Sequence, residues 1–566
     1  MDSARTPTSI DRIAEGWVDT IVELAPTVGT YIGRESSTLA DYSPAGAEAV
    51  AAAERRVLAQ LDAATEVDAV DGVTRADLSA ELRLSLAEHE MGEHLRDLNV
   101  IASPMQDMRD VFDLMPTDTV SDWERIALRL RAVPQAIAGY QASLAEGASR
   151  RLTPALRQVT EVAAQVRRTA GTADAPGYFR SLVKASEAES GPEGVDATLV
   201  RELEAAAAEA STAFAEFAGF LEADLAPQAH IADAFGRERY ELASEGFLGA
   251  RVDLDETYEW GIEELARMVE EQERIAAEIV GGSPRPGIVA ETIAHLDRDP
   301  SRKLHGTAEL QRWMQETSDR AIADLGDTQF DVPAEIRTLE CMIAPTQEGG
   351  IYYTGPSDDF SRPGRMWWSV PAGVETFDTW RELTTVYHEG VPGHHLQIGQ
   401  AVVNRGTLNE WRRQLAGTSG HAEGWALYAE RLMEQLGYLD DPADRFGMLD
   451  GQRMRAARVV LDIGVHLGKQ RPDGGGVWTG DYAFEFMGQH VNMESSFVRF
   501  EVLRYLGWAG QAPAYKIGQR IWEELRDEAR ARATGSGSPF DIRDFHRSAL
   551  ALGGVRLDTL QQALRP

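Results

Sequence analysis

The sequence predicts a mainly α protein that carries one small antiparallel β-sheet. Long stretches rich in Ala, Leu, Glu and Arg place apolar residues three and four positions apart, which is the spacing of an amphipathic helix. Residues 329–371 differ, because aromatic and β-branched runs bounded by Gly and Pro are typical of short strands. No stretch resembles a long linker between domains. We therefore expect a single large domain over residues 1–566.

Helical patterns dominate the N-terminal half, residues 1–330. The clearest helical stretches are residues 47–61, 75–98, 123–145, 153–170 and 197–225. Pro134 lies inside the third of these stretches. Because proline lacks an amide hydrogen and its ring clashes with the preceding turn, we expect it to kink or break that helix.

The C-terminal half, residues 331–566, combines the expected sheet with further helices. Strands are expected at Ile351–Thr354 and at residues 366–370, where aromatic residues are frequent. Helical patterns then continue from residue 379 to residue 532, and a last helix is expected to begin at Ile542. The residues that could carry chemistry are concentrated in this half.

The composition restricts the partners that the chain can have. Its 566 residues include 56 Lys and Arg against 91 Asp and Glu, a net charge of −35. Such an acidic surface repels phosphate backbones and anionic lipids, so we expect neither nucleic acid nor a membrane as a partner. The single cysteine, Cys341, excludes an intramolecular disulfide. Residues 1–20 lack the apolar stretch of a signal peptide, which predicts a cytoplasmic protein.

The strongest motif lies in a region enriched in histidine. Six of the 12 histidines fall between residues 388 and 490, and the motif is Val386-Tyr-His-Glu-Gly-Val-Pro-Gly-His-His-Leu-Gln397. In zinc metallopeptidases, a His-Glu-x-x-His helix places two imidazoles one turn apart and its Glu acts on metal-bound water. A different pair, His89 and His94, is five residues apart among charged residues, which predicts a solvated helix face.

Pro392 occupies the position where the second histidine of that helix would fall. Because proline disrupts a continuous helix and Gly393 relaxes the backbone, the helix should break after Glu389. Such a break would bring His394 to the place of the missing histidine. His388 and His394 are therefore predicted to be metal ligands, and the alternative is that they are buried structural residues.

A third candidate ligand, Glu423, lies 35 residues after His388 in the segment Ser419-Gly-His-Ala-Glu-Gly-Trp-Ala-Leu-Tyr-Ala-Glu430. A carboxylate from a following helix commonly completes a site that begins with two histidines. The alternative is a carboxylate that is simply favoured by the dipole in the first turn of its helix. Glu430, beside Arg431, is expected to be an ordinary surface charge.

Several blocks together resemble a bacterial family named domain of unknown function 885, whose signature is HExxPGHxxQ. The other blocks that carry the resemblance are Gly349-Gly-Ile-Tyr-Tyr, Arg362-Pro-Gly, Glu423-Gly-Trp-Ala-Leu-Tyr428, Arg458-Val-Val-Leu-Asp-Ile-Gly-Val-His466 and Arg504-Tyr-Leu-Gly-Trp-Ala-Gly-Gln-Ala-Pro-Ala-Tyr-Lys-Ile-Gly518. The family is similar to gluzincin metallopeptidases, especially the all-helical carboxypeptidase Taq family. The resemblance implies a large helical fold with a deep cleft, one zinc ion and peptide hydrolysis.

The same resemblance implies roles for four residues. His388, His394 and Glu423 correspond to the zinc ligands, and Glu389 corresponds to the general base. We therefore expect a zinc-dependent peptidase, either a carboxypeptidase or an oligopeptidase, with a peptide as its substrate. Two alternatives stay open: a peptide-binding protein without metal on a peptidase-like scaffold, and a metal-dependent hydrolase of another amide or ester. The sequence leaves the oligomeric state open.

Three further residues are candidates for catalysis. Tyr505 and Tyr515 each carry a hydroxyl that could donate to a developing oxyanion, although a core aromatic is the alternative for both. Asp462 lies four residues before His466, so the two could face each other on one helix and orient the imidazole. His466 is then either an oxyanion donor or part of a buried structural pair.

Two residues are candidates for substrate binding. Arg504 could bind a substrate carboxylate through two hydrogen bonds, or it could simply neutralise nearby acids. Tyr353 lies in the expected strand Ile351–Thr354, and an edge strand of a peptidase can pair with an extended peptide. The alternative is a small covering sheet without a ligand.

Overall fold

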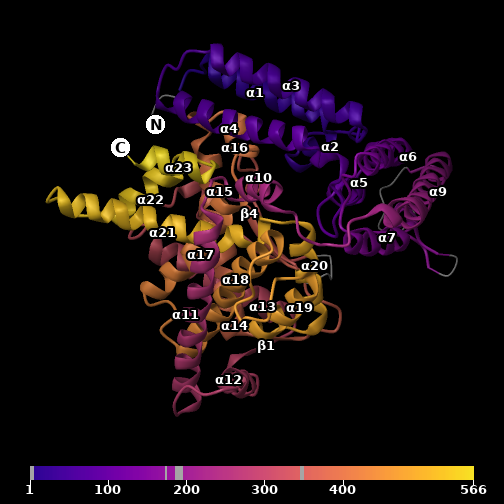
Figure 1. Ribbon diagram of the computed structural model, residues 1–566. Coiled ribbons are helices and arrows are strands. Elements are labelled where there is room, and N and C mark those ends of the chain that lie inside the picture. The colour runs from indigo at the N-terminus through magenta and orange to yellow at the C-terminus, as the bar shows by residue number, and fades with distance from the viewer. Residues whose placement is uncertain (1–4, 173–174, 185, 187–194, 345–349, 566) are drawn as a thin grey trace.

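The computed structural model describes residues 5–172, 175–184, 186, 195–344 and 350–565 (Figure 1). Gly349, which begins one of the family-like blocks, lies outside these residues. The described chain is mainly helical, so the predicted fold class is confirmed. None of its helices is long and apolar enough to cross a membrane.

The N-terminal helices form the upper layer and the right-hand lobe in Figure 1. Their bounds are α1 Ser9–Leu24, α2 Pro26–Tyr31, α3 Pro44–Ala63, α4 Ala69–Met91, α5 Pro104–Asp110, α6 Val120–Ser149, α7 Leu156–Ala170, α8 Tyr178–Lys184 and α9 Ala197–Phe220. Each of the five predicted helical stretches overlaps one of these helices. α4 ends earlier than expected because Gly92 adopts a left-handed conformation, with φ of 78°.

The predicted break at Pro134 is wrong, because α6 continues through this residue. Leu130 and Val133 on one side of the proline and Ile137 on the other are all buried, and the helix packs against α9. Burial of this apolar face on both sides favours a continuous helix. Tertiary packing therefore outweighs the local cost of the proline.

The remaining helices occupy the centre and the lower part of Figure 1, except that α21, α22 and α23 extend to the left. Their bounds are α10 Arg237–Leu248, α11 Leu254–Val280, α12 Ile288–Leu296, α13 Thr307–Leu325, α14 Thr379–Glu389, α15 His394–Val403, α16 Glu410–Gln414, α17 Ser419–Gln435, α18 Pro442–Leu467, α19 Gly480–His490, α20 Ser495–Gly507, α21 Gln511–Gly535, α22 Ile542–Leu550 and α23 Leu557–Leu564.

The described strands form two small sheets, where the sequence predicted one antiparallel sheet. β1 (Lys303–His305) pairs antiparallel with β5 (Thr376–Asp378). The second sheet has the order β2–β4–β3, with bounds Leu339–Ile343, Gly364–Trp368 and Ile351–Thr354. β3 is antiparallel to β4, but β2 is parallel to it. The parallel pairing could not be predicted because it joins segments that are not connected by a hairpin.

The apolar core has a large C-terminal part and two smaller N-terminal parts. The largest cluster of buried residues runs from Tyr240 in α10 to Leu560 in α23. A second cluster lies mainly among α5 to α9, and a third joins α1, α3 and α4 to Trp411 of α16. Helices α10 to α13, before residue 331, thus pack with the C-terminal half. The single-domain organisation stays a prediction.

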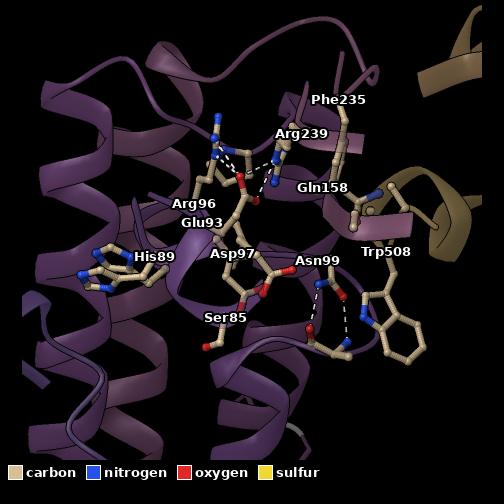
Figure 2. A pocket seen from close by; sticks show the side chains of 18 of the residues that line it. Ser85, His89, Glu93, Arg96, Asp97, Asn99, Gln158, Phe235, Arg239 and Trp508 are labelled. Carbon is tan, nitrogen blue, oxygen red and sulfur yellow. Dashed lines mark hydrogen bonds and ion pairs between the residues drawn. The ribbon is translucent and has the colours of Figure 1, made fainter. Parts of the chain in front are cut away.

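A cavity of 490 Å³ lies where α4 meets α10 and the turn after α20 (Figure 2). Glu93 lies inside it and pairs with Arg96 and Arg239, in both cases at 2.7 Å. The rings of His89 and His94 stack with centroids 4.5 Å apart beside the cavity, and both side chains are half-buried. The prediction of a solvated helix face is therefore wrong for this pair. None of the residues predicted for the metal site lines this cavity.

Candidate metal centre

The helix is interrupted between α14 and α15, as the Pro-Gly motif predicts. α14 ends at Glu389, and α15 begins at His394. Gly393 closes the turn: its amide donates to the Tyr387 carbonyl at 3.1 Å, and a Cβ at this position would overlap the carbonyl oxygen of His388. Trp425 of α17 donates its indole N–H to the Pro392 carbonyl at 2.8 Å. The turn is therefore held by contacts that only glycine at 393 permits.

The break brings His388, His394 and Glu423 together. Their potential ligand atoms all lie within 4.8 Å of one another. Glu423 Oε2 is 3.2 Å from His388 Nε2 and 3.6 Å from His394 Nε2. The histidines are buried, whereas 21% of the Glu423 side chain is exposed. Two imidazole nitrogens and one carboxylate oxygen thus converge on one point that solvent can reach, a donor set that fits a divalent metal ion.

Glu430 orients the first histidine. It is 1% exposed, and its two oxygens face His388 Nδ1 at 2.8 Å and the Gln452 amide at 3.1 Å. The expectation of a surface charge is therefore wrong. Arg431, whose proximity suggested that expectation, pairs instead with Glu271 and Glu434. A carboxylate that accepts the second ring N–H of a ligating histidine is a common feature of metal sites.

The protonation of His388 reflects these two carboxylates. Burial favours the neutral imidazole, but hydrogen bonds to Glu423 and Glu430 prevail and raise the pKa of His388 to about 10. The pKa of Glu423 is held well below its ordinary value, because the hydrogen bonds of His388 and His394 outweigh the effect of burial. A cation is thus favoured at the point where these side chains meet.

Glu389 is placed differently from the three clustered side chains. It is 7% exposed, and its Oε2 atom is buried without a hydrogen-bond partner among the described residues. Burial raises its pKa, although the nearby His394 and His388 oppose this shift. A buried carboxylate with one free oxygen and a raised pKa is suited to accepting a proton.

Tyr515 lies between the cluster and a group of arginines. Burial and the negative charge of Glu423 raise the pKa of Tyr515, whereas Arg504, Arg458 and Arg455 lower it. The Arg458 guanidinium carbon is 5.1 Å from the centroid of the Tyr515 ring. Of the two predicted tyrosines, Tyr515 is thus the one whose electrostatic surroundings include Glu423 of the cluster.

Tyr505 and His466 have their polar atoms engaged elsewhere. The Tyr505 hydroxyl is fully buried, accepts from Arg458 Nε at 2.6 Å and donates to Glu501. His466 Nδ1 accepts from the Phe235 amide at 3.3 Å, and its Nε2 faces the Tyr505 carbonyl at 3.0 Å. These contacts favour the structural alternative for both residues.

The predicted pairing of Asp462 with His466 is absent among the described residues. Asp462 Oδ1 instead accepts from the Tyr240 hydroxyl at 2.7 Å and from the Gly510 amide at 2.9 Å. The Tyr240 ring stacks on His466 with centroids 5.5 Å apart. Residues four apart on a helix can contact each other, but here both side chains form hydrogen bonds to groups of other elements instead.

The two residues predicted to bind substrate are partly engaged. Arg504 donates to Gln511 and lies 3.4 Å from Glu501. The Tyr353 hydroxyl lies 3.0 Å from His395 Nδ1, while Nε2 of that ring faces the Ile336 carbonyl at 2.8 Å. The edge strand β3 is thus tied to α15, the helix that begins with His394.

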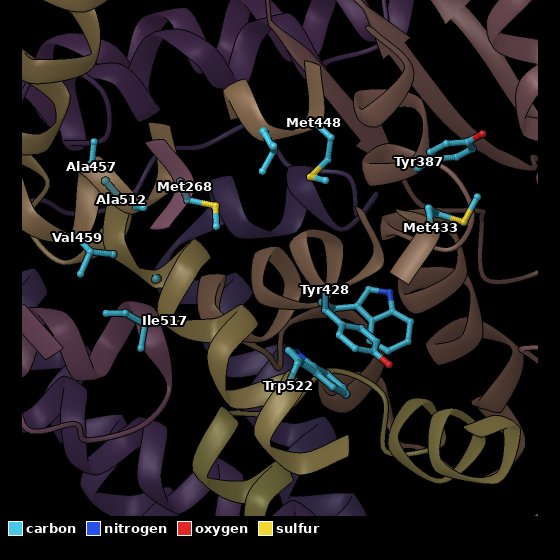
Figure 3. Close-up of a cluster of buried hydrophobic side chains, with 14 of the residues drawn as sticks. Met268, Tyr387, Tyr428, Met433, Met448, Ala457, Val459, Ala512, Ile517 and Trp522 are labelled. Carbon is cyan, nitrogen blue, oxygen red and sulfur yellow. The ribbon is translucent and has the colours of Figure 1, made fainter. Parts of the chain in front are cut away.

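Close packing of α17 against α21 fixes the third ligand. Gly420 and Gly424 of α17 face Gly518 of α21, and a Cβ on Gly424 would lie 2.5 Å from the Gly518 carbonyl carbon. Trp522 of α21 donates to the His421 carbonyl at 3.1 Å and stacks on Tyr428 of α17 (Figure 3). The backbones meet where glycine allows it, which brings Glu423 and Tyr515 to the same side of the core.

Sequence reasoning missed Glu430, Arg455 and Trp425. Glu430 follows Glu423 by seven residues, and residues two turns apart share a helix face, so this spacing could have identified it. For Arg455 and Trp425 the sequence holds no comparable signal, because the groups around them come from other elements of the fold.

Comparisons with known proteins agree with the motif analysis. A family model described as "Bacterial protein of unknown function (DUF885)" matches residues 26–564. A structure of a "putative lipoprotein" from Colwellia psychrerythraea has a TM-score of 0.83 and 21% identity, and the match covers 99% of each chain. A structure of a "putative lipoprotein of unknown function" from Shewanella oneidensis has a TM-score of 0.76 and 16% identity, over 99% of this chain and 100% of that chain.

Two other comparisons carry no functional argument. A Pyrococcus furiosus carboxypeptidase structure has 12% identity and a TM-score of 0.33 over 94% of this chain and 96% of that chain, which is too low to support a shared fold. No curated protein matches the chain.

The prediction of a cytoplasmic location is contradicted by these comparisons. Both similar structures are described as lipoproteins, a description that points to a membrane-anchored or extracytoplasmic location.

Proposed function

The chain belongs to the bacterial DUF885 family of unknown function, and we propose that it is a zinc-dependent hydrolase of peptides. The observation that carries the proposal is the convergence of His388, His394 and Glu423 beside Glu389. Three ligands with one position left for water, and a neighbouring carboxylate as base, are the arrangement of catalytic zinc sites. The buried, unpartnered Glu389 oxygen supports a catalytic rather than a purely structural site.

The donor set favours zinc over the hard cations. Calcium and magnesium prefer oxygen ligands, whereas two imidazoles and one carboxylate suit zinc. Zinc held by His388, His394 and Glu423 would lower the pKa of a coordinated water toward neutrality and polarise a substrate carbonyl. Glu430 would keep the His388 ring in the orientation that points Nε2 to the ion.

Glu389 and Tyr515 are the residues assigned to proton transfer and to stabilisation of the oxyanion. Glu389 accepts a proton from the attacking water through its free oxygen and passes it to the leaving amine. The Tyr515 hydroxyl is the candidate donor to the oxyanion that forms on the carbonyl, since Tyr515 is close enough to Glu423 for its pKa to respond.

The position of β3 supports a peptide as the substrate. β3 is the outer strand of its sheet, and its Tyr353 is linked to His395, next to the second ligand. A strand at a sheet edge offers backbone groups to an extended peptide. Hydrolysis of another amide or ester would use the same water and base, so substrate panels have to separate these activities.

The direct test is metal content together with turnover. Purified protein should contain about one zinc per chain, and His388→Ala should lose it. Peptide hydrolysis should stop on chelation and return with zinc. Retention of zinc by His388→Ala would contradict the ligand assignment, and zinc without hydrolysis of any peptide in a broad library would contradict the peptidase assignment.

A further inference from the structure

Arg455 is a cation without an ion-paired side chain in the part of the chain that the structure describes. It lies on α18, half-buried, and it makes no hydrogen bond or ion pair with another side chain among the residues that the structure describes. Its Nε atom is buried without an acceptor. Removing a guanidinium N–H from water without an acceptor costs free energy, so this position needs a reason.

The guanidinium of Arg455 lies back along its own helix over Gly451. A Cβ at position 451 would be 2.7 Å from Arg455 Nη1 and 3.7 Å from Cζ. Because Gly451 lies one turn earlier, its missing side chain leaves the room in which the guanidinium lies. The charge is therefore held in a defined place rather than extended into solvent.

That place is beside the candidate metal centre. Arg455 follows Gln452 by one turn of α18 and precedes Arg458 by one turn; the Gln452 amide donates to Glu430 at 3.1 Å, and the Arg458 guanidinium carbon is 5.1 Å from the centroid of the Tyr515 ring. In keeping with this position, Arg455 lowers the pKa of Glu389, Glu430 and Tyr515. Neither carboxylate pairs with it: Glu430 binds His388 and Gln452, and the free oxygen of Glu389 has no partner among the described residues. The positive charge thus lies near the candidate site without an ion pair of its own among the described residues.

The other arginines around Tyr515 are engaged. Arg458 binds Glu501 at 2.8 Å and the Tyr505 hydroxyl at 2.6 Å, and Arg504 binds the same Glu501 and Gln511. One carboxylate therefore serves two arginines, and the third is left over. Glu389, Glu423 and Glu430 lie nearby, but Arg455 forms no ion pair with a carboxylate among the described residues, so its guanidinium is available to an anionic ligand.

We propose that Arg455 binds the C-terminal carboxylate of the substrate peptide, which makes the protein a carboxypeptidase. The inference rests on the proposed hydrolase function and adds the substrate class. A guanidinium and a carboxylate form two parallel hydrogen bonds, which fixes the last residue of the peptide in one orientation. An internal segment of a longer chain has no charge to offer there, so only the terminal peptide bond would be placed for attack.

The reaction balances without any further reagent. Water adds its oxygen to the carbonyl carbon of the last peptide bond, and that C–N bond breaks. Glu389 carries the water proton to the leaving nitrogen. The products are a peptide one residue shorter with a new carboxylate and a free amino acid, whose own carboxylate is still held by Arg455.

Binding can be tested without turnover. In a Glu389→Gln background, calorimetry should show that a peptide with a free C-terminus binds about 10- to 100-fold more tightly than the same peptide with a C-terminal amide, as expected for charge-assisted hydrogen bonds. Arg455→Met should remove this preference and leave the affinity for the amide unchanged. Arg453→Met, on the same helix and bound to Gln272 and the Gln489 carbonyl, should keep it.

A second variant moves the charge without removing it. Gly451→Ala places a methyl group against Arg455 Nη1, and alanine is well tolerated in a helix. It should weaken binding of the free acid specifically, while Arg455→Lys should restore part of the preference lost in Arg455→Met. Equal losses of affinity for the free acid and for the amide in Arg455→Met, Gly451→Ala and Arg455→Lys would mean that Arg455 is structural and would overturn the proposal.

Product analysis separates this inference from the proposed function. The wild-type protein should release single amino acids from free C-termini, and Arg455→Met should raise KM for these substrates by about 10-fold or more. Equal cleavage of amidated peptides, or internal cleavage, would contradict the carboxypeptidase assignment but keep the hydrolase. Selective binding of free acids with no hydrolysis would overturn the hydrolase and leave Arg455 as the carboxylate-binding residue.

Discussion

Glu389 and Glu423 both lie close to His388, yet their contacts assign them different tasks. Glu423 shares one oxygen between the two candidate histidine ligands, at 3.2 and 3.6 Å. Glu389 has a buried oxygen without a partner among the described residues and a raised pKa. The first arrangement suits a ligand, and the second suits a base.

Substituting each glutamate by glutamine separates these tasks. Glu389→Gln cannot accept a proton, so kcat should fall by at least ~100-fold while zinc content and folding are retained. Glu423→Gln should instead lose zinc first and activity as a consequence. Kinetics combined with elemental analysis checks both variants, and an exchange of the two outcomes would require the roles to be exchanged.

Glu430 provides a further prediction at this scale. Glu430→Gln can still accept a hydrogen bond but lacks the charge that holds the His388 ring, so zinc affinity should fall by about 10- to 100-fold. Glu434→Gln is a matched control on the same helix, because Glu434 contacts Arg431 rather than a ligand. Titration with a chelator measures the difference, and equal affinities in the two variants would exclude the orienting role.

At the scale of elements, the turn between α14 and α15 decides whether a site forms. In a continuous helix His388 and His394 would not meet at one ion, whereas the turn brings their ring centroids to 4.8 Å. The Trp425 indole and the absence of a Cβ at Gly393 hold this turn. The geometry of the candidate ligands therefore depends on residues that are not candidate ligands themselves.

Gly393→Ala tests this dependence. The added Cβ would overlap the His388 carbonyl, so the turn has to open, with a loss of stability on the order of 2–4 kcal/mol and of zinc affinity. Gly406→Ala is the control, because a Cβ there has nothing within 4 Å. Denaturant unfolding and zinc titration should show lower stability and lower zinc affinity only for Gly393→Ala.

For the whole molecule, the cavity between the N-terminal layer and the C-terminal half introduces a dependence of stability on pH. Burial, with repulsion from Asp107 and Glu93, raises the pKa of Asp97 to about 7. The folded state therefore binds more protons than the unfolded state between about pH 4 and pH 7. The contribution of Asp97 to the free energy of unfolding is therefore fully present below this window and is lost as the pH rises through it.

Asp97→Asn should remove this contribution. Each pKa unit corresponds to about 1.4 kcal/mol, and the partial exposure of Asp97 reduces the effect. The free energy of unfolding of the variant, compared with that of the parent, should therefore be higher at pH 8 than at pH 4 by on the order of 1–2 kcal/mol. The exposed Glu90→Gln on α4 is the control. Denaturant unfolding of the variant and the parent at both pH values measures the difference, and a gain that is equal at both would contradict the assignment.

From the sequence alone we could predict the helical class and name the three candidate ligands and the candidate base. These features are local: helical periodicity recurs every few residues, and the Pro-Gly break lies inside the motif that it shapes. The same locality explains why β3 was predicted with its observed bounds, since its aromatic run is bounded by Gly and Pro.

Which other polar residues lie near the candidate site depends on how the helices pack in three dimensions. Glu430, Tyr515 and Arg455 come from α17, α21 and α18, and no spacing along the chain predicts where those helices cross. His466 fell outside the site for the same reason, because backbone groups of distant segments take its two nitrogens. A side chain's role depends on the partners that burial gives it, and those partners are set by the packing of whole elements.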